Sequence, residues 1–337
     1  MAVTIKDVAK KAGVSISTVS KCINGGNVLE PKRTEILKAI EELNFRVNPL
    51  ARGMKTKKTS TVGVLIPNIS DYFGRTILSY ASRYLYGANY STVFCDYVIF
   101  DDSKTNVSEK IKFLLKYSVD GVIVQPVDIR PEELDLFRKE NVPVVFVDLK
   151  DDSHFYDSVT LNNEKAVYDV ISKLTAVGHK RIAFVSGRPG ISTTDERVTG
   201  YMRALRDAGL PVIPEYVFRK TIDSDSGYEA MEHFMSLKEK PSAVFIGGHD
   251  LVTGALSYCS EHKVSIPDDI SFVGFENEEA SKIYRPTLSY ATQPMKKMAE
   301  GACQMLIDRI NGSYVGAARC SVMNADFVEG LSVKNMN

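Results

Sequence analysis

Hydroxyl-bearing side chains cluster in one short segment near the start of the chain, together with a lysine. The segment contains Ser15, Ser17, Thr18, Ser20 and Lys21, with Ile16 among them. Hydroxyls at the start of a helix bind phosphate oxygens together with the unpaired backbone N–H groups there. An exposed isoleucine can touch a thymine methyl, and a lysine can reach guanine acceptors. The segment therefore carries the side chains needed to read the major groove of DNA.

A second group of ligand-binding side chains is spread over the rest of the chain, where short β-branched runs end. It comprises Asp71, Tyr72, Phe73, Asp148, Thr193, Thr194, Arg197, His249, Asp250 and Glu276. Carboxylates and an arginine bind vicinal hydroxyls or a ligand carboxylate, and an aromatic side chain stacks on a ligand ring. Each residue alone is explained equally well as a helix cap or a solvated loop residue, above all Asp71 and Asp250. Their shared placement after strands predicts a small-molecule site.

The sequence motifs of common enzymes are absent from the chain. It contains no G-x-G-x-x-G, G-x-x-x-x-G-K-[ST], G-x-S-x-G or H-E-x-x-H pattern. Its five histidines are dispersed and its five cysteines form no C-x-x-C pair, so neither a metal site nor a disulfide framework is indicated. We expect no enzymatic activity, metal or cofactor, and we expect His179 to be structural.

The first 47 residues, here called the head, must position the hydroxyl-rich segment. Thr4 and Asp7 have the spacing of a capping box, which predicts a helix through Ala12 that stops at Gly13. Ser15 can cap a second helix to about residue 22, and a third helix is expected over residues 31–43. The head is thus predicted to be a helix-turn-helix unit of three helices, with the hydroxyl-rich segment opening its second helix.

Residues 61–337, here called the body, alternate strand and helix patterns. Strands are expected in two sets: residues 62–66, 92–95, 121–124 and 144–147, then residues 181–185, 217–219, 243–246 and 271–275. Spacings of about 20–35 residues are typical of βαβ units, so we predict two doubly wound parallel-sheet subdomains of α/β class. Ligands bind outside the carboxyl ends of such strands, which places the site in the cleft between the subdomains.

Residues 48–60 connect the head to the body. Asn48 can cap a short helix that Pro49 opens and that Gly53 weakens by about 1 kcal/mol relative to alanine. A helix this short is marginal alone, so we expect it to order only when a partner holds it.

Charge is divided unevenly along the chain, although the total is zero. Residues 1–60 carry a net charge of +7 and residues 61–337 a net charge of −7. Such asymmetry is a cue for nucleic-acid or membrane contact. No run of 18 apolar residues exists, and the N-terminus becomes charged too early for a signal peptide, so we expect a cytoplasmic protein with no membrane partner.

Several motifs resemble the lactose-repressor/galactose-repressor family of bacterial transcription regulators. They are residues 4–20 (TIKDVAKKAGVSISTVS), 48–54 (NPLARGM), 63–68 (GVLIPN), 120–123 (DGVI), 178–183 (GHKRIA) and 267–275 (PDDISFVGF). The resemblance covers essentially the whole chain. It implies a dimeric operator-binding repressor whose periplasmic-binding-protein-like body is switched by a small-molecule effector. It also places the first subdomain at about residues 61–160 and 292–322, and the second at about residues 161–291 and 323–337.

The resemblance assigns roles to individual residues. Ile16, Ser17 and Lys21 stand where family members read bases, and Met54 stands where a leucine usually wedges into the minor groove. The DNA-binding residues it implies are Thr4, Ser15, Ile16, Ser17, Thr18, Ser20, Lys21, Asn24, Asn48, Leu50, Arg52, Met54 and Lys55. The effector-binding residues it implies are Asp71, Tyr72, Phe73, Asp148, Thr193, Arg197, Ile222, His249 and Glu276.

Three of the effector-binding positions depart from the family pattern. Glu276 replaces a common aspartate, His249 replaces a common asparagine, and Ile222 lies where an aromatic often stacks. These departures argue against a simple hexose and leave open a sugar-like or nucleoside-like effector or a protein corepressor. A binding protein of the transport class and an effector-independent architectural DNA binder remain alternatives. A homodimer is expected, paired through helices near residues 73–88 and 250–261.

Overall fold

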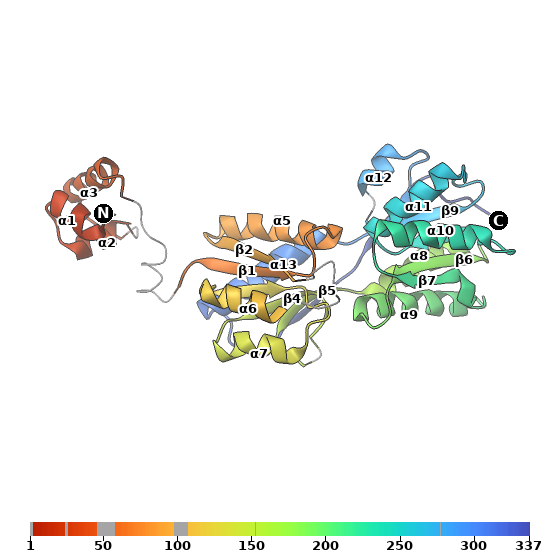
Figure 1. Ribbon diagram of the computed structural model, residues 1–337, viewed down its shortest axis with the longest axis horizontal. Helices are drawn as coiled ribbons and strands as arrows, with labels where there is room; N and C mark the ends of the chain where they lie inside the picture. The colour runs from red at the N-terminus through yellow and green to blue at the C-terminus, as the bar shows by residue number, and fades with distance from the viewer. Residues whose placement is uncertain (1–2, 24–25, 46–57, 98–106, 152, 277) are drawn as a thin grey trace. The chain divides into compact units, whose positions relative to one another are not determined.

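The computed structural model describes residues 3–23, 26–45, 58–97, 107–151, 153–276 and 278–337. The chain forms two compact units, residues 1–60 and residues 61–337, which are described separately below (Figure 1). Asn24 and the predicted hinge residues Asn48, Leu50, Arg52, Met54 and Lys55 lie outside the described residues. No helix among the described residues is long and apolar enough to cross a membrane.

The head has the three expected helices: α1 (Ile5–Lys11), α2 (Ile16–Ile23) and α3 (Glu30–Glu42). At the start of α1 the Asp7 carboxylate accepts hydrogen bonds from the backbone N–H and hydroxyl of Thr4, at 2.8 and 2.7 Å. Gly13 has a φ of +60°, which glycine adopts without strain and which separates α1 from α2. The three helices share one core, formed by Val8, Ala9, Val19, Cys22, Ile36 and Ala39.

The first sheet of the body has six strands in the order β11-β5-β4-β3-β1-β2, and all of its pairings are parallel. They are β1 (Thr61–Ile66), β2 (Ser91–Asp96), β3 (Gly121–Val124), β4 (Val144–Asp148), β5 (Asp157–Leu161) and β11 (Cys320–Met323). Helices α5 (Tyr72–Gly87) and α13 (Met295–Asn311) share one apolar core with the sheet. Helices α6 (Val107–Lys116) and α7 (Pro131–Lys139) share a second core with it.

The second sheet has six strands in the order β12-β10-β9-β8-β6-β7. They are β6 (Ile182–Gly187), β7 (Val217–Lys220), β8 (Ala243–Ile246), β9 (Ser271–Phe275), β10 (Ser289–Thr292) and β12 (Asp326–Val328), which pairs antiparallel with β10. Helices α8 (Asn163–Ala176) and α9 (Ser192–Asp207) pack in one core. Helices α10 (Ser224–Ser236) and α11 (His249–Glu261) pack in another, while α12 (Glu278–Ile283) and the 3-10 turn η1 (Pro214–Tyr216) complete the unit.

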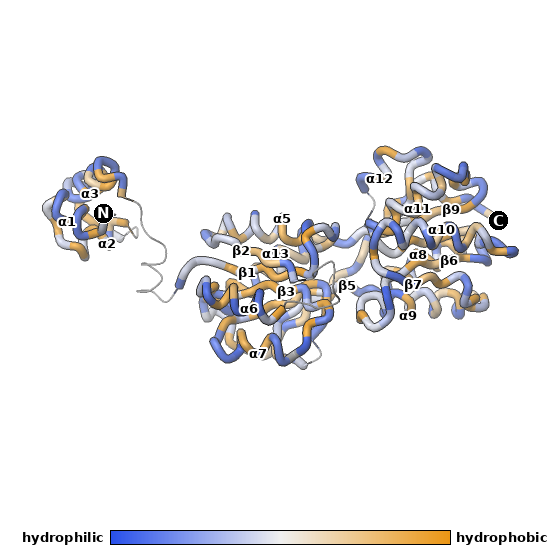
Figure 2. Tube along the Cα trace, in the orientation of Figure 1, coloured by the Kyte–Doolittle hydropathy of each residue, from blue (hydrophilic) through white to orange (hydrophobic). Residues whose placement is uncertain are grey.

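The chain passes between the two sheets three times: after β5, after β10 and after β11. Figure 2 shows mostly hydrophobic strands inside each unit and polar stretches along the outer helices. Three covalent connections allow the two sheets to change their angle without separating, which is the mechanical requirement for a cleft that opens and closes.

The number of strands differs from the expectation of four in each set, because β5, β10, β11 and β12 were not predicted. In β11 the exposed fraction alternates along the strand, and β12 has only three residues. β5 is fully buried but reads Asp-Ser-Val-Thr-Leu, which is too polar for the β-branched signal of a central parallel strand. The strands that were missed are therefore the short, polar or edge strands.

Candidate functional site

The start of α2 presents the hydroxyl-rich segment on the surface of the head. Ser15, Ser17 and Lys21 are exposed, and the apolar Ile16 is 44% exposed. The Ser15 hydroxyl accepts from the backbone N–H of Thr18 at 3.2 Å and lies 2.8 Å from the Thr18 hydroxyl. The opposite side of α2 is fixed in the core by Val19 and Cys22. The helix is therefore anchored through its apolar face, with its polar start accessible to a partner.

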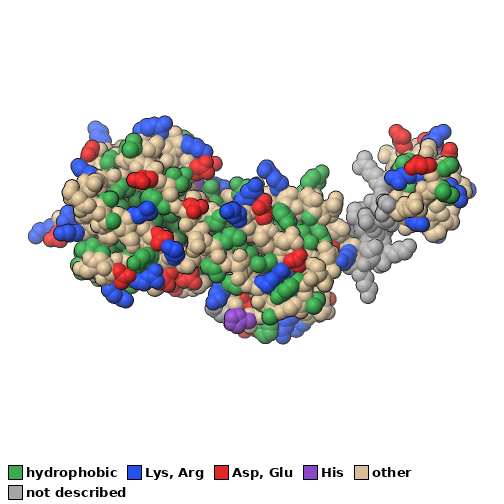
Figure 3. Space-filling model, turned by 180° about the vertical axis from the view of Figure 1, so that it is seen from behind, with side chains coloured by type: hydrophobic (Ala, Val, Ile, Leu, Met, Phe, Trp, Pro, Cys, Tyr) green, Lys and Arg blue, Asp and Glu red, His purple; other side chains and the backbone are tan. Residues whose placement is uncertain are grey.

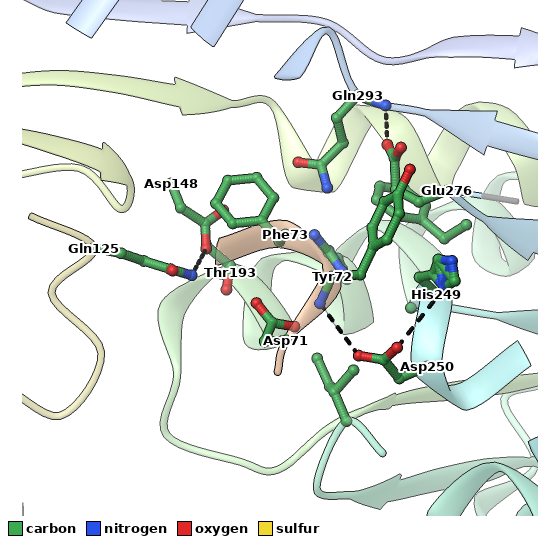
Figure 4. A pocket seen from close by; sticks show the side chains of 14 residues that line it. Asp71, Tyr72, Phe73, Gln125, Asp148, Thr193, His249, Asp250, Glu276 and Gln293 are labelled. Carbon is green, nitrogen blue, oxygen red and sulfur yellow. Dashed lines mark hydrogen bonds and ion pairs between the residues drawn. The ribbon is translucent and has the colours of Figure 1, made fainter. Parts of the chain in front are cut away.

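The predicted residues of the body lie around a single pocket between the two sheets (Figure 4). It encloses about 510 Å³ of space, including the part open to solvent. Ten of its lining residues were expected: Asp71, Tyr72, Phe73, Asp148, Thr193, Arg197, Ile222, His249, Asp250 and Glu276. Thr194 was expected too but does not line the pocket; its buried hydroxyl donates to the carbonyls of Arg188 and Ile191.

Strand ends and helix starts position the lining residues. Asp71 caps α5, its carboxylate accepting from the Gly74 N–H at 2.9 Å, so its expected capping role is confirmed. Asp148 ends β4 and Glu276 follows β9, with left-handed φ angles of 77° and 63°. Such backbone angles are uncommon for residues other than glycine and cluster at functional sites. Both carboxylates are thus held at the carboxyl edge of their sheets by backbone geometry as well as by side-chain contacts.

Arg197 is the positively charged group among the lining residues. It is buried in α9, where its Nε donates to Asn163 Oδ1 and its Nη1 to the Gly247 carbonyl, both at 2.9 Å. Its guanidinium carbon lies 4.4 Å from the centroid of the Phe275 ring. Burial lowers the pKa of Arg197, while the carboxylates of Asp148 and Glu276 oppose that change. The guanidinium is therefore rigidly oriented.

Burial raises the pKa values of the carboxyl groups in the pocket. The pKa of Asp148 is raised to about 6, although Arg197 and a 3.2 Å hydrogen bond from Gln125 Nε2 favour its ionised form. The pKa of Glu276 is raised to about 7, against opposing hydrogen bonds from the Gln293 N–H and the Thr292 hydroxyl. Burial also raises the pKa of Asp71. Strongly shifted pKa values in a cleft are typical of binding sites.

Contacts across the pocket join the two sheets directly. The Tyr72 ring lies 3.9 Å from the His249 ring, measured between centroids, and the Tyr72 N–H donates to Asp250 Oδ2 at 3.5 Å. A separate ion pair joins Arg188, after β6, to Asp128, after β3. Burial lowers the pKa of His249, which favours the neutral imidazole. The observed arrangement of the two sheets is thus held by polar and aromatic contacts.

Sequence reasoning missed four lining residues: Gln125, Gly248, Phe275 and Gln293. Gln125 follows β3 directly, so it carries the same signal of a polar residue after a strand that identified the others. Gln293 follows β10, a strand that was itself missed. His179, by contrast, has the expected structural role, with its ring nitrogens 2.9 Å from the Ser242 hydroxyl and 3.0 Å from the Lys334 carbonyl.

Two protein families match this sequence. Residues 4–48 match the bacterial regulatory proteins of the lacI family, and residues 171–333 match the periplasmic binding protein-like domain. Catabolite control protein A from Priestia megaterium is 35% identical over 94% of this chain and 96% of its own. The transcriptional regulator RegA from Clostridium saccharobutylicum is 34% identical over 92% and 93%, and a PurR repressor from Actinobacillus pleuropneumoniae is 32% identical over 99% of both chains.

Solved structures share the fold. The lac repressor dimer bound to operator and the anti-inducer ONPF superposes with a TM-score of 0.85 at 23% identity, covering 98% of this chain and 99% of that chain. The complex of the transcriptional regulator CelR with cellobiose superposes with a TM-score of 0.73 at 24% identity, over 98% and 99%. The lac repressor and CelR therefore share the architecture of this chain, a helical head joined to an α/β body of two sheets.

Proposed function

Because this chain belongs to the lacI family of bacterial regulatory proteins, a family of transcription regulators and not of enzymes, we propose that it is a repressor switched by a small molecule. In this proposal α2 reads operator bases, and a ligand in the pocket of the body changes operator affinity. The residues concerned in the head are Thr4, Ser15, Ile16, Ser17, Thr18, Ser20 and Lys21, with residues 48–60 as the hinge. We expect the protein to act in the cytoplasm, on the chromosome.

The proposed switch rests on one observation: residues of both sheet units line the same pocket. Asp71 and Asp148 belong to the first sheet unit, whereas Arg197, His249 and Glu276 belong to the second. A ligand that contacts both units binds one angle between the sheets better than another. It therefore shifts the equilibrium between the two angles by its difference in affinity for them.

A homodimer is part of the proposal. One helix-turn-helix buries too little surface for strong specific binding, so two heads on two half-sites are needed. Tyr86 at the end of α5 is 83% exposed, and Phe94 on the edge strand β2, which follows α5 in the chain, is 44% exposed, which supports a contact between copies that includes α5. In Figure 3 acidic and basic side chains are intermixed over the visible face of the body.

Selection of binding sites from a pool of random DNA tests the DNA-binding part. We expect the full chain to enrich a palindrome whose half-site centres are one helical turn, about 10 base pairs, apart. Residues 61–337 alone, with a net charge of −7, should enrich nothing. Failure of the full chain to enrich any sequence would overturn the proposed function.

A thermal-shift screen of sugars, nucleosides and small acids tests the switch. We expect at least one compound to raise the melting temperature of the body and to change operator affinity in a fluorescence anisotropy titration. A ligand that stabilises the body but leaves operator affinity unchanged would contradict the proposed coupling.

A further inference from the structure

The charges that line the pocket are predominantly negative. Asp71, Asp148, Asp250 and Glu276 contribute four carboxyl groups, and Arg197 is the only arginine or lysine among the lining residues. Arg75 lies nearby, with its guanidinium carbon 5.3 Å from the Tyr72 ring centroid, but it is exposed and does not line the pocket.

Arg197 cannot balance this group of carboxyls. Two of its hydrogen bonds go to Asn163 and to the Gly247 carbonyl, and its guanidinium stacks over Phe275. These contacts fix its position, so its single charge offsets at most one of the four carboxylates. An anionic ligand would therefore meet more repulsion than attraction in this pocket.

Two glutamines add hydrogen-bond acceptors that have no partner. Gln125 and Gln293 are 6% and 7% exposed, both line the pocket, and the Oε1 atom of each is buried without a hydrogen bond. Figure 4 shows the Gln293 amide extending between Phe73 and Tyr72. A buried acceptor without a partner costs about 1–3 kcal/mol, which a ligand that brings a donor recovers. These unpartnered acceptors are an observation independent of the carboxyl groups.

We propose that the pocket binds a small molecule that carries an ammonium group, in preference to a neutral or anionic molecule of the same size. This inference rests on the proposed function, because it assigns a chemical class to the effector of that pocket. An ammonium group supplies three donors and no acceptor, which matches the excess of acceptors. The aromatic ring of Phe73 also lines the pocket, and an aromatic ring attracts a cation to its face (Figure 4).

The pKa values of the carboxyls agree with this preference. Burial raises the pKa of Asp148 to about 6 and that of Glu276 to about 7, so near neutral pH the empty pocket holds Asp148 mostly ionised and Glu276 partly protonated. A bound cation favours their ionised forms and so replaces those protons.

Three probes with one carbon skeleton test the charge preference: 2-amino-1,3-propanediol, glycerol and glycerate. Each is titrated into the full chain at pH 7.5 and constant ionic strength, with binding measured by ligand-observed NMR. We expect 2-amino-1,3-propanediol to bind at least about tenfold more tightly than glycerol, which is 1.4 kcal/mol, and glycerate to bind most weakly.

Two variants locate the effect. Asp148→Asn should weaken binding of 2-amino-1,3-propanediol by about tenfold and change glycerol binding by less than about twofold. Glu140→Gln, which removes an exposed carboxylate outside the pocket, should change neither. If Asp148→Asn does not fold, Asp250→Asn in the first turn of α11 makes the same test.

The outcomes separate this inference from the proposed function. Equal or tighter binding of glycerol or glycerate, or no binding of the amine, overturns the charge preference even if the full chain binds its operator. A full chain that selects no operator overturns the proposed function even if the amine binds. Loss of amine binding in Glu140→Gln would show that the amine binds outside the pocket and would also overturn the inference.

Discussion

The ring of Tyr72 stacks on the imidazole of His249 across the pocket, with centroids 3.9 Å apart and planes inclined by 31°. Tyr72 begins α5, which packs on the first sheet, and His249 begins α11, which packs on the second. Any rotation that widens the pocket at this point must separate the two rings. The contact therefore stabilises the observed angle between the sheets.

A double-mutant cycle measures this contact. Tyr72→Ala and His249→Ala should each lower the free energy of unfolding, and their coupling should be about 0.5–1.5 kcal/mol, the range for an aromatic pair. Urea titration of the single and double variants gives the coupling. The same cycle on Phe113 and Tyr117, whose rings are 4.6 Å apart within the first sheet unit, is a control for an aromatic contact that does not join the two sheets. A Tyr72–His249 coupling near zero would mean that the rings do not hold the sheets together.

The ion pair between Arg188 and Asp128 is a second contact across the sheets. Both side chains are about half exposed, at 48% and 45%, so the pair should contribute only about 0.2–1 kcal/mol and should weaken as salt increases. We expect Arg188→Gln to change ligand affinity by about twofold to fivefold at low salt and less at high salt.

Lys220→Gln provides a matched control for that prediction. Lys220 pairs with Glu229 at similar exposures of 53% and 46%, but both residues belong to the second sheet unit. Its removal should leave ligand affinity unchanged. If calorimetric titration shows equal effects of the two substitutions on ligand affinity, the Arg188–Asp128 pair has no special role in holding the two sheets around the ligand.

The sequence predicts strands well where burial is complete and composition is apolar. β1, β3, β8 and β9 are nearly or fully buried and rich in valine, isoleucine and phenylalanine, and each lies where it was expected. β11 and β12 are strands because they pair with β5 and β10, which supply their hydrogen-bond partners. Such pairing cannot be predicted from the local composition of β11 or β12. The tertiary context thus determines one edge of each sheet, whereas the opposite edges, β2 and β7, were predicted from the sequence.

The same distinction separates the predicted from the missed pocket residues. Asp148 and Glu276 follow strands that the sequence shows clearly, so their placement could be predicted. Phe275 is the last residue of β9, predicted only as part of a strand, and its ring lines the pocket with Arg197 stacked over it. Gln293 could not be predicted, because it follows β10, a strand that the sequence did not indicate. β10 pairs with β9, and α12 lies between these two strands in the chain.

The raised pKa of Glu276 predicts a pH dependence of stability. Its pKa rises from an ordinary 4.5 to about 7 in the folded protein, so between these values the folded state holds a proton that the unfolded state has lost. The stability contributed by this protonation is present below pH 4.5 and is lost as pH rises through about 7. The loss is on the order of 1–3 kcal/mol.

Glu276→Gln tests this dependence, because glutamine keeps an acceptor for the Gln293 N–H but does not titrate. Its free energy of unfolding, measured in urea from pH 4.5 to pH 8, should fall less than that of the wild type. Glu140→Gln should follow the wild-type curve, since Glu140 is exposed. Parallel curves for Glu276→Gln and the wild type would contradict the raised pKa.

Ile16 is an apolar side chain that the head does not use for its own folding. It is 44% exposed at the start of α2 and lies outside the head core, whereas Val19 on the same helix is fully buried. If Ile16 contacts a thymine methyl, Ile16→Ala should lower affinity for the selected operator by about 1–3 kcal/mol and leave the melting temperature of the head unchanged. It should not change the salt dependence of binding, because the variant loses no phosphate contact.

Leu37→Ala is the matched control for Ile16→Ala. Leu37 is 52% exposed, also apolar, and lies on α3 rather than in the segment expected to read bases. Anisotropy titrations of both variants over a range of salt concentrations separate base reading from electrostatic attraction. A loss of operator affinity in Leu37→Ala equal to that in Ile16→Ala would mean that α2 is not the principal element that reads the bases.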